Sequence, residues 1–456
     1  MDTNFISAFR EAAPYIHYLN GKTIVLSVGS HIVRHQNFPR LARDIALLNS
    51  LGMKIVIIHG VRGFLEDNGM DGDYVRDYRV TTPDAMEEIK RSCGSLRLDI
   101  EAALGMCFLN TPANTTKLSI AGGNFILAQP LGVLDGVDMQ RTGQVRKIDA
   151  EQIKRCLANN QVVLISPVGH SVGGISYNLS LPETAAALAS ALGAEKLVFL
   201  CRANGIRDED NAPIPDLSIK DALQYCQENP QHEDIMRSIQ AALVALKNGV
   251  SRVQIIDGRE DGALLKELFT RTGFGTALAN NSLTQIRPAE VRDIPDLMRL
   301  IEPLIQRGNL LPRTKNDIER HLSEFVIAEH DRLVYGCAAL KSFADDKAGE
   351  IYCLAVSEKG RGMGYGDLLL QAVENRAVKQ GLTQLFALTT RTADWFLERG
   401  FEASDLNALP ATRREQYIEN KRNSKIFVKQ PKSSPFQAAW KVNMLSKNTC
   451  ITRNTC

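Results

Sequence analysis

The sequence predicts an α/β protein of two domains, the first with a mainly parallel sheet sandwiched by helices and the second with a mixed sheet. The chain has 456 residues, which is too long for one ordinary domain. Short β-branched runs alternate with longer helical patterns up to about residue 276. Beyond a polar "NNS" stretch at 280–282, three apolar runs follow one another with only short connections, which is typical of antiparallel strands.

The first domain, predicted at 1–280, reads as strands and helices in turn. Its expected strands are 22–29, 54–60, 161–169, 195–201 and 252–258, and its expected helices are 38–52, 183–194 and 235–249. The strands are nearly continuous apolar runs, as expected for strands that are buried on both faces. This alternation predicts a parallel sheet with helices on both sides.

The second domain, predicted at 284–429, begins with a different order of elements. Its expected strands are 284–290, 325–330, 333–340, 349–356, 383–389 and 424–429, and its expected helices are 293–306, 314–324, a segment after residue 364, and 392–400. The consecutive strands indicate a sheet that is antiparallel at first. The last segment, 430–456, has no sustained period and is predicted to be a disordered tail.

Composition excludes several classes of protein. Lysine and arginine number 54 against 52 acids, so we expect neither a nucleic-acid partner nor an acidic membrane surface. No apolar run reaches the roughly 20 residues of a membrane span, and the N-terminus lacks the pattern of a secretory signal. Nine dispersed cysteines without a C-x-x-C pair indicate a reducing, cytoplasmic location. His31 and His35 lack a further ligand, so we expect no metal.

A glycine-rich loop ahead of a predicted helix is the strongest local signal. The loop "RGMGYG" consists of Arg361, Gly362, Met363, Gly364, Tyr365 and Gly366. Free backbone N–H groups at a helix N-terminus suit a phosphate. Asp367 follows where a nucleotide-binding P-loop needs lysine and where a dinucleotide fingerprint needs glycine, so both of these alternatives fail.

The loop fits the [QR]-x-x-G-x-[GA] pattern of the GCN5-related N-acetyltransferases. The preceding "GEIYCLAV" and the later "WFLERGF" are also similar to that family. The resemblance implies acetyl coenzyme A as co-substrate, with its pyrophosphate on the loop amides. It also implies that the pantetheine arm pairs like an added strand with the segment before the loop, which consists of Cys353, Leu354, Ala355 and Val356.

The first domain resembles the amino-acid kinase family, most closely acetylglutamate kinase. The matching segments include "HG" at 59–60, "YRVTT" at 78–82, "ISPVG" at 165–169 and "YNLSLPETAAALASALGAEKLVFL" at 177–200. Ser27 and Ser238 stand where that family has catalytic lysines, and Val61 and Arg62 interrupt a glycine-rich turn. Positive charge on the transferred phosphoryl group is central to such reactions, so we expect no kinase activity.

A kinase-like domain joined to an acetyltransferase domain resembles the N-acetylglutamate synthase family, which catalyses the first step of arginine biosynthesis. The resemblance implies L-arginine as a feedback effector on the first domain, at Tyr15, Lys196, Glu267 and Gly275. A guanidinium group needs a planar carboxylate partner, which Glu267 would supply. Gln254 stands where the family often has histidine. The resemblance also implies homo-oligomers, with dimers assembled into a hexamer.

Acetylation of L-glutamate needs a proton acceptor, oxyanion donors and cationic anchors for two carboxylates. Glu350 is the candidate base, and the Cys353 backbone N–H is a candidate donor to the thioester carbonyl. No histidine lies near Cys353 in the sequence to activate its thiol, so a covalent cysteine mechanism is a minor alternative. The resemblance implies that Arg313, Arg422 and Ser424 hold the substrate carboxylates.

The sequence leaves open which residue acts as general acid, and it leaves two alternative functions to be tested. The general acid for the thiolate is unassigned, although Thr389, Thr390 and Asp394 follow the strand after the glycine loop helix. The alternatives to a synthase are acetylglutamate kinase, which the serines at 27 and 238 disfavour, and a non-catalytic arginine sensor, which the intact glycine loop disfavours.

Overall fold

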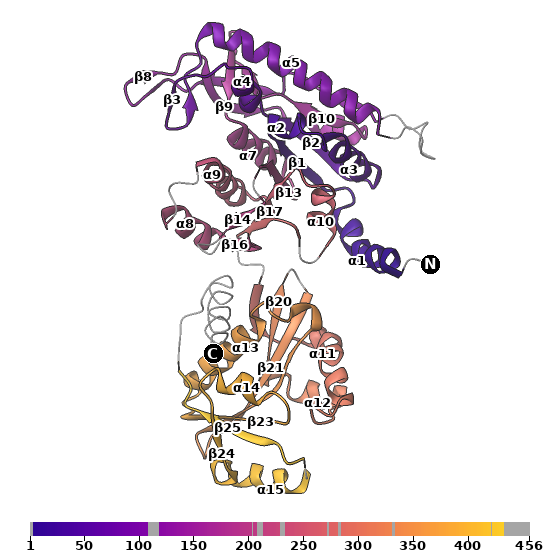
Figure 1. Cartoon of the computed structure of the whole chain (residues 1–456), viewed down its shortest axis with the longest axis vertical. Helices are drawn as coiled ribbons and strands as arrows, with labels where there is room; N and C mark the ends of the chain where they lie inside the picture. Colours follow the sequence, from indigo (N-terminus) through magenta and orange to yellow (C-terminus); the bar gives the residue numbers. More distant parts are fainter. Residues whose placement is uncertain are drawn as a thin grey trace, which may run out of the picture. The chain divides into compact units, whose positions relative to one another are not determined.

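The computed structural model describes residues 3–107, 118–202, 204–207, 213–228, 233–270, 273–280, 284–330, 333–420 and 422–432 (Figure 1). The chain divides into two compact units, Met1–Ser282 and Leu283–Cys456. Most of the tail predicted at 430–456 lies outside the described residues. No helix among the described residues is long and apolar enough to cross a bilayer.

The first unit is built on an eight-stranded sheet, counted over its described residues. The strand order is β16 (Asp216–Ser218), β18 (Thr276–Ala279), β17 (Arg252–Asp257), β13 (Lys196–Cys201), β1 (Thr23–Val28), β2 (Lys54–His59), β10 (Val162–Ile165) and β5 (Ile120–Ala121). The central strands are parallel, as predicted, whereas β18 runs antiparallel to β17. The predicted fold class is therefore confirmed, with one reversed strand.

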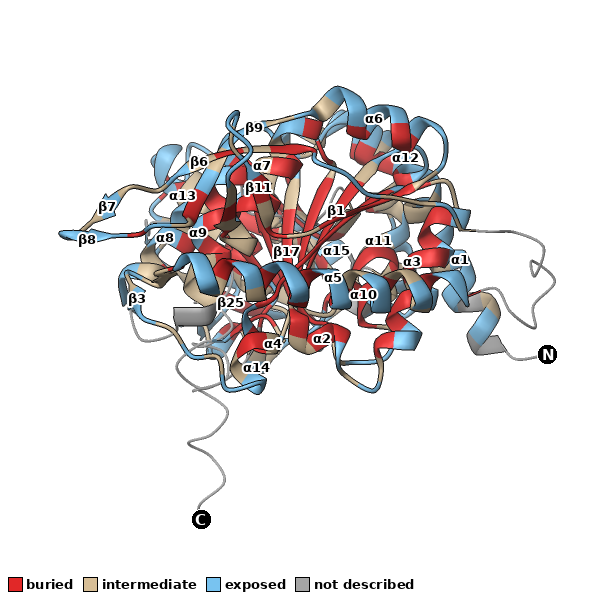
Figure 2. Ribbon diagram, turned by 90° about the horizontal axis from the view of Figure 1, so that it is seen from above, coloured by how far each residue is buried: buried red, intermediate tan, exposed pale blue. Residues whose placement is uncertain are grey.

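Helices cover both faces of this sheet, and the buried strands lie between them (Figure 2). One face packs against α1 (Thr3–Leu19), α3 (Phe38–Ser50), α5 (Pro83–Gly105) and α10 (Ala263–Phe269). The other carries α7 (Leu181–Leu192) and α9 (Glu233–Lys247). Side chains alternate along β13, and Val198 and Leu200 face the layer that holds α1 and α10.

Several smaller elements of the first unit were not predicted. A closed barrel of four short strands joins β6 (Ile126–Pro130), β9 (Thr142–Ile148), β11 (Val168–His170) and β12 (Ser176–Leu179). The segment predicted as one strand at 161–169 is therefore divided between β10 in the sheet and β11 in the barrel. The remaining elements are α2 (Ser30–Val33), α4 (Arg62–Asp67), α6 (Ala150–Ala158), α8 (Ile219–Glu228), and the hairpins β3 (Tyr74–Val75) with β4 (Tyr78–Arg79), β7 (Val133–Leu134) with β8 (Val137–Asp138), and β14 (Ile206–Arg207) with β15 (Pro213–Ile214).

The second unit has a mixed sheet of seven strands among its described residues. Their order is β19 (Thr284–Pro288), β20 (Phe325–His330), β21 (Leu333–Phe343), β22 (Ala348–Val356), β23 (Gln384–Thr389), β25 (Lys425–Lys429) and β24 (Glu402–Ser404). The first four strands are antiparallel, β22 and β23 are parallel, and β25 is antiparallel to both of its neighbours. The predicted mixed sheet is confirmed.

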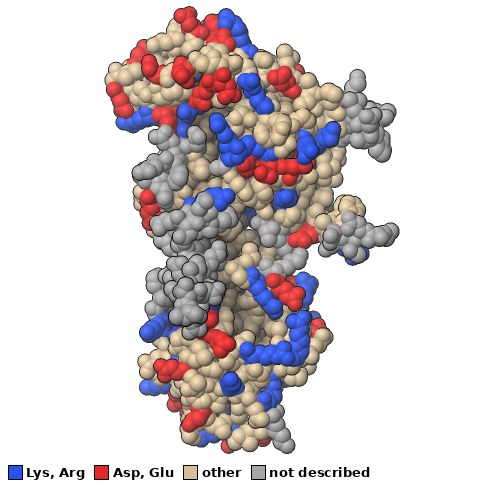
Figure 3. All heavy atoms as spheres, viewed as in Figure 1, with Lys and Arg blue, Asp and Glu red and all other residues tan. Residues whose placement is uncertain are grey.

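Two hydrophobic layers cover this sheet. On one face lie α13 (Tyr365–Lys379) and α14 (Ala393–Leu397), and on the other lie α11 (Ile294–Gln306) and α12 (Lys315–Arg320). A further helix, α15 (Ala411–Asn420), precedes β25. Basic and acidic side chains are interspersed over the visible surface of each unit, without one continuous basic face (Figure 3).

Candidate functional site

A β-bulge interrupts β22 at the position where the sequence predicts thioester chemistry. Cys337 of β21 pairs with Ala355 and Ala339 pairs with Tyr352, so two residues of β22 face one residue of β21. Cys353 lies within the bulge and has a φ of 50°, which is uncommon for a residue with a side chain. The bulge puts Tyr352 and Cys353 on the same face, that of α11, and removes this stretch from regular pairing.

The two parallel strands of the second unit, β22 and β23, separate where the bulge begins. β22 and β23 pair from Ala348 with Gln384 to Ile351 with Ala387, and both strands continue beyond the last pair. Among the described residues, no strand pairs with the 352–356 edge of β22 on that side. The edge predicted to pair with pantetheine is therefore open to an extended ligand.

The glycine loop connects this open edge to α13. Gly362 and Gly364 have φ angles of 77° and 79°, which glycine adopts without steric cost, and Gly364 is the N-cap residue of α13. The first N–H groups of this 15-residue helix have no acceptor within the helix. Gly366 lies close to Trp395 of α14. A Cβ atom at residue 366 would be only 3.2 Å from the indole ring. The predicted loop is thus held against the "WFLERG" segment.

An ion pair fixes the same contact between α13 and α14. Asp367, in the first turn of α13, accepts hydrogen bonds from Nε and Nη2 of Arg399. The Arg399 guanidinium lies 4.1 Å from the Trp395 ring centroid. Asp367, which rules out both a P-loop and a dinucleotide fingerprint, therefore has a structural partner in Arg399.

The thiols beside the bulge are poorly suited to nucleophilic attack. Burial raises the pKa of Cys353 to about 11, although the Arg313 guanidinium opposes this shift. Burial also raises the pKa of Cys337 well above its ordinary value, and its Sγ–H donates to the Cys353 carbonyl over 3.3 Å. The thiolate is the reactive form of cysteine, so this environment favours the backbone role predicted for Cys353 over a covalent one.

The two predicted anchor arginines approach one region of the second unit. Arg313, between α11 and α12, lies 4.4 Å from the ring centroid of Tyr352, next to Cys353. Arg422 donates a hydrogen bond to the carbonyl of Gly308, five residues before Arg313. Ser424 is buried immediately before β25. The structure therefore places Arg313 beside the bulge and joins Arg422 to the connection between α11 and α12, whereas the role of Ser424 as a substrate ligand stays a prediction.

Glu350, the candidate base, already has a partner that the sequence analysis did not find. Its two carboxylate oxygens accept hydrogen bonds from Nε and Nη2 of Arg413, each over 2.7 Å, and both side chains are less than 10% exposed. Each oxygen keeps a second lone pair for a water or amine. The role of Glu350 as base stays a prediction, and the pair adds an anchoring role. Arg413 was missed because "TRREQYIENKRNSK" holds several basic residues and nothing marks the buried one.

The predicted effector residues share the layer between the first sheet and helices α1 and α10. Lys196 is buried and lies two residues before Val198 on β13. Side chains two residues apart on a strand point to the same face, so Lys196 faces this layer. Tyr15 of α1 packs in the same cluster. Glu267 of α10 accepts hydrogen bonds from the backbone N–H groups of Phe274 (2.6 Å) and Gly275 (3.1 Å).

Gln254 lies between these residues. It pairs with Val198 on one side and Ala277 on the other, so Gly275 is its diagonal neighbour, about 7–8 Å away. Its side chain is 1% exposed, and its Oε1 has no hydrogen-bond partner among the described residues. A buried acceptor without a partner is unfavourable and indicates a place for a donor.

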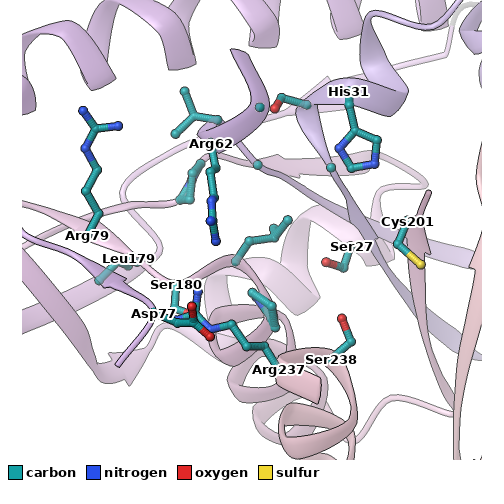
Figure 4. Close-up of a pocket in the computed structure, with 18 of the residues that line it drawn as sticks. Ser27, His31, Arg62, Asp77, Arg79, Leu179, Ser180, Cys201, Arg237 and Ser238 are labelled. Carbon is teal, nitrogen blue, oxygen red and sulfur yellow. The ribbon is translucent and has the colours of Figure 1, made fainter. Parts of the chain in front are cut away.

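A cavity of about 410 Å³ lies at the carboxyl ends of β1, β2 and β13 (Figure 4). The strand order reverses about β1, which is where open α/β sheets bind ligands. Ser27 and Ser238 line this cavity, as do Val61 and Arg62. No lysine lines it in the described part of the chain. The departures from the kinase pattern are thus gathered in one cavity, at the switch point of the first sheet.

The fold and these sites define a class of protein, an acetyltransferase of the GNAT type joined to an amino-acid-kinase-like domain. Residues 22–257 match the amino acid kinase family, and residues 290–401 match the acetyltransferase (GNAT) family.

Several known proteins match this chain over nearly its whole length. An amino-acid acetyltransferase of Neisseria meningitidis is 42% identical over 432 residues, covering 93% of this chain and 98% of the relative. One of Serratia proteamaculans is 39% identical over 434 residues, with the same coverage. The crystal structure of N-acetylglutamate synthase from Neisseria gonorrhoeae, complexed with coenzyme A and L-arginine, has a TM-score of 0.81 and 41% identity, covering 93% of this chain and 99% of that one. The chain belongs to the family of amino-acid acetyltransferases, the N-acetylglutamate synthases.

Proposed function

We propose that the second domain transfers the acetyl group of acetyl coenzyme A to the α-amine of L-glutamate by direct attack. The observation that carries this proposal is the open edge of β22, which has a bulge at Cys353 and leads into a glycine loop at the start of α13. Such an edge can pair with the pantetheine arm as an added strand, while the loop and helix N–H groups donate hydrogen bonds to the pyrophosphate. The N-acetylglutamate synthase of Neisseria gonorrhoeae has also been crystallised with coenzyme A and N-acetyl-glutamate.

The residues around this edge take distinct roles in the proposal. The Cys353 N–H donates to the thioester carbonyl as negative charge develops on it. Arg313 and Arg422, with Ser424, hold the carboxylates of L-glutamate. Glu350 receives the amine proton, directly or through a water, by the oxygen lone pairs that Arg413 leaves available. The departing thiolate needs no assigned acid.

The first domain is proposed to be a kinase-inactive regulator that binds L-arginine. Glu267 would receive the guanidinium group, and the Gln254 oxygen supplies a further acceptor in the same buried layer. The Neisseria gonorrhoeae relative was crystallised with L-arginine. We also propose that the chain forms homo-oligomers through this domain and acts in the cytoplasm, where the seven described cysteines would stay free thiols, as they are here.

A thiol-release assay with acetyl coenzyme A, a panel of amino acids and L-arginine tests these proposals. We expect release of coenzyme A that depends on L-glutamate, is abolished in Arg422→Ala, and changes when L-arginine is added. Release with another amino acid would retain the transferase and refute the substrate. No release with any amine, together with L-arginine binding, would favour the sensor. Turnover of ATP with N-acetylglutamate would contradict the proposed loss of kinase activity.

A further inference from the structure

Helix α15 is attached to the second domain mainly by polar contacts. Of its residues whose exposure is described, only Arg413, Arg414 and Tyr417 are not exposed, and its Ile418 is 60% exposed. Arg413 and Tyr417 are four residues apart and therefore lie on the same face of the helix. A helix without an apolar stripe gains little from hydrophobic burial. Its position therefore depends on the partners of these side chains.

Arg413 attaches the helix to the centre of the sheet. Its guanidinium forms the two 2.7 Å hydrogen bonds to Glu350 of β22 described above. Paired donors and acceptors of this kind fix orientation as well as distance. Arg414 adds hydrogen bonds to the carbonyls of Asn407 and Leu409, which hold the start of the helix.

Tyr417 connects the same helix face to the turn that follows it. Its hydroxyl donates to the carbonyl of Ser424 over 2.6 Å, and its ring packs on a cluster that includes Phe386 and Ile426. Asn423 in this turn has a φ of 51°, and β25 begins directly after Ser424. The turn is thus held by strand pairing on one side and by Tyr417 on the other.

We propose that Arg413 and Tyr417 are positioning residues, which set the turn carrying Arg422 and Ser424 so that it can grip a substrate carboxylate. The inference rests on the proposed function, because the turn matters in this way only if it binds the substrate. Contacts to a carboxylate that does not react hold the substrate equally before and during the transfer, so a misplaced turn should raise KM and leave kcat nearly unchanged. Glu350 anchors this scaffold in addition to its predicted role in proton transfer.

The decisive variant is Tyr417→Phe, which removes one hydroxyl and keeps the ring in the hydrophobic cluster. We expect KM for L-glutamate to rise about 5- to 10-fold, from the loss of one hydrogen bond. KM for acetyl coenzyme A and kcat should stay within about twofold, because neither depends on this turn. Discrimination between L-glutamate and L-glutamine should fall, which a purely structural role of Tyr417 would not cause. Tyr18→Phe is the matched control, since its hydroxyl donates to Glu195 over 2.6 Å in the first domain.

A double-mutant cycle tests whether Tyr417 acts through Arg422. We expect Tyr417→Phe to change KM for L-glutamate much less in an Arg422→Lys background than alone, since groups that act as a unit are not additive. Independent effects of the two substitutions would overturn the inference. So would an unchanged KM for L-glutamate in Tyr417→Phe, or an equal rise for both substrates.

A second variant guards against a folding defect in Tyr417→Phe. Arg413→Lys keeps the charge but loses the paired geometry, and we expect it to raise KM for L-glutamate about 10-fold or more with a smaller change for acetyl coenzyme A. Equal changes for both substrates would again overturn the inference. If the unchanged protein shows no turnover dependent on L-glutamate, the proposed function itself is refuted. Turnover with unaltered KM in both variants refutes only the positioning role.

Discussion

Removal of the Glu350 side chain should destabilise the second domain more than any exposed charge could. In Glu350→Ala the Arg413 guanidinium loses both 2.7 Å acceptors and stays in a site where its side chain is 7% exposed. Water screens such a buried charge poorly. Breaking a buried pair by deletion of one partner costs about 3–5 kcal/mol. We expect a decrease of this size in the free energy of unfolding.

Urea unfolding followed by tryptophan fluorescence measures this change in the right domain. Of the two tryptophans of the chain, Trp395 packs against the core of the second unit, so its signal reports on that unit, whereas Trp440 lies outside the described residues. The matched control is Glu358→Ala, which removes an exposed partner 3.4 Å from Arg307 and should cost less than about 1 kcal/mol.

A double substitution separates the cost of an orphaned charge from the value of the pair. Glu350→Leu combined with Arg413→Met replaces both charged groups by apolar ones of similar size. Such replacements are often neutral or stabilising, so we expect most of the lost stability to return even though activity does not. A loss below about 1 kcal/mol in Glu350→Ala would refute the reasoning, because it would mean that Arg413 finds solvent when its partner is removed.

Three further outcomes follow from the two domains. Burial lowers the pKa of His59 to about 4 from an ordinary 6.5, so the unfolded state binds a proton first as pH falls. Stability of the first domain should therefore decrease by about 3 kcal/mol between pH 6.5 and 4, measured by calorimetry, and His59→Gln should lose this dependence. Glu267→Gln should lose L-arginine binding in calorimetric titration, whereas Glu260→Gln, on the exposed surface, should bind normally. Gly364→Ala places a side chain at a φ of 79°, which should lower the free energy of unfolding by about 1–2 kcal/mol and raise KM for acetyl coenzyme A. The control Gly381→Ala, at a φ of 73°, should lower the free energy of unfolding equally without changing KM.

Local pattern was sufficient for the elements whose surroundings are simple. β1, β2, β13 and β17 are buried between two helical layers, so most of their residues are apolar and the strands can be recognised without knowledge of the fold. The glycine loop was also predictable, because the φ angles near 80° at residues 362 and 364 favour glycine over any residue with a side chain.

The parts that failed to appear in the sequence depend on distant partners. Arg413 is one basic residue among several until β22, 63 residues earlier, supplies Glu350. The bulge at Cys353 could not be predicted from the sequence either, because cysteine has no particular preference for a positive φ. The barrel strand β11 continues an apolar run that begins in β10, and periodicity alone cannot show that the two strands belong to different sheets.

The open edge of β22 also bears on the solubility of the protein. Unpaired N–H and C=O groups along a strand are a template for pairing with another chain, and proteins usually cover or interrupt such edges. Here the proposed cover is the co-substrate itself, which would complete the sheet between β22 and β23. Acetyl coenzyme A would then act as a guard against aggregation as well as an acetyl donor, and the protein would be most prone to self-association when the co-substrate is depleted.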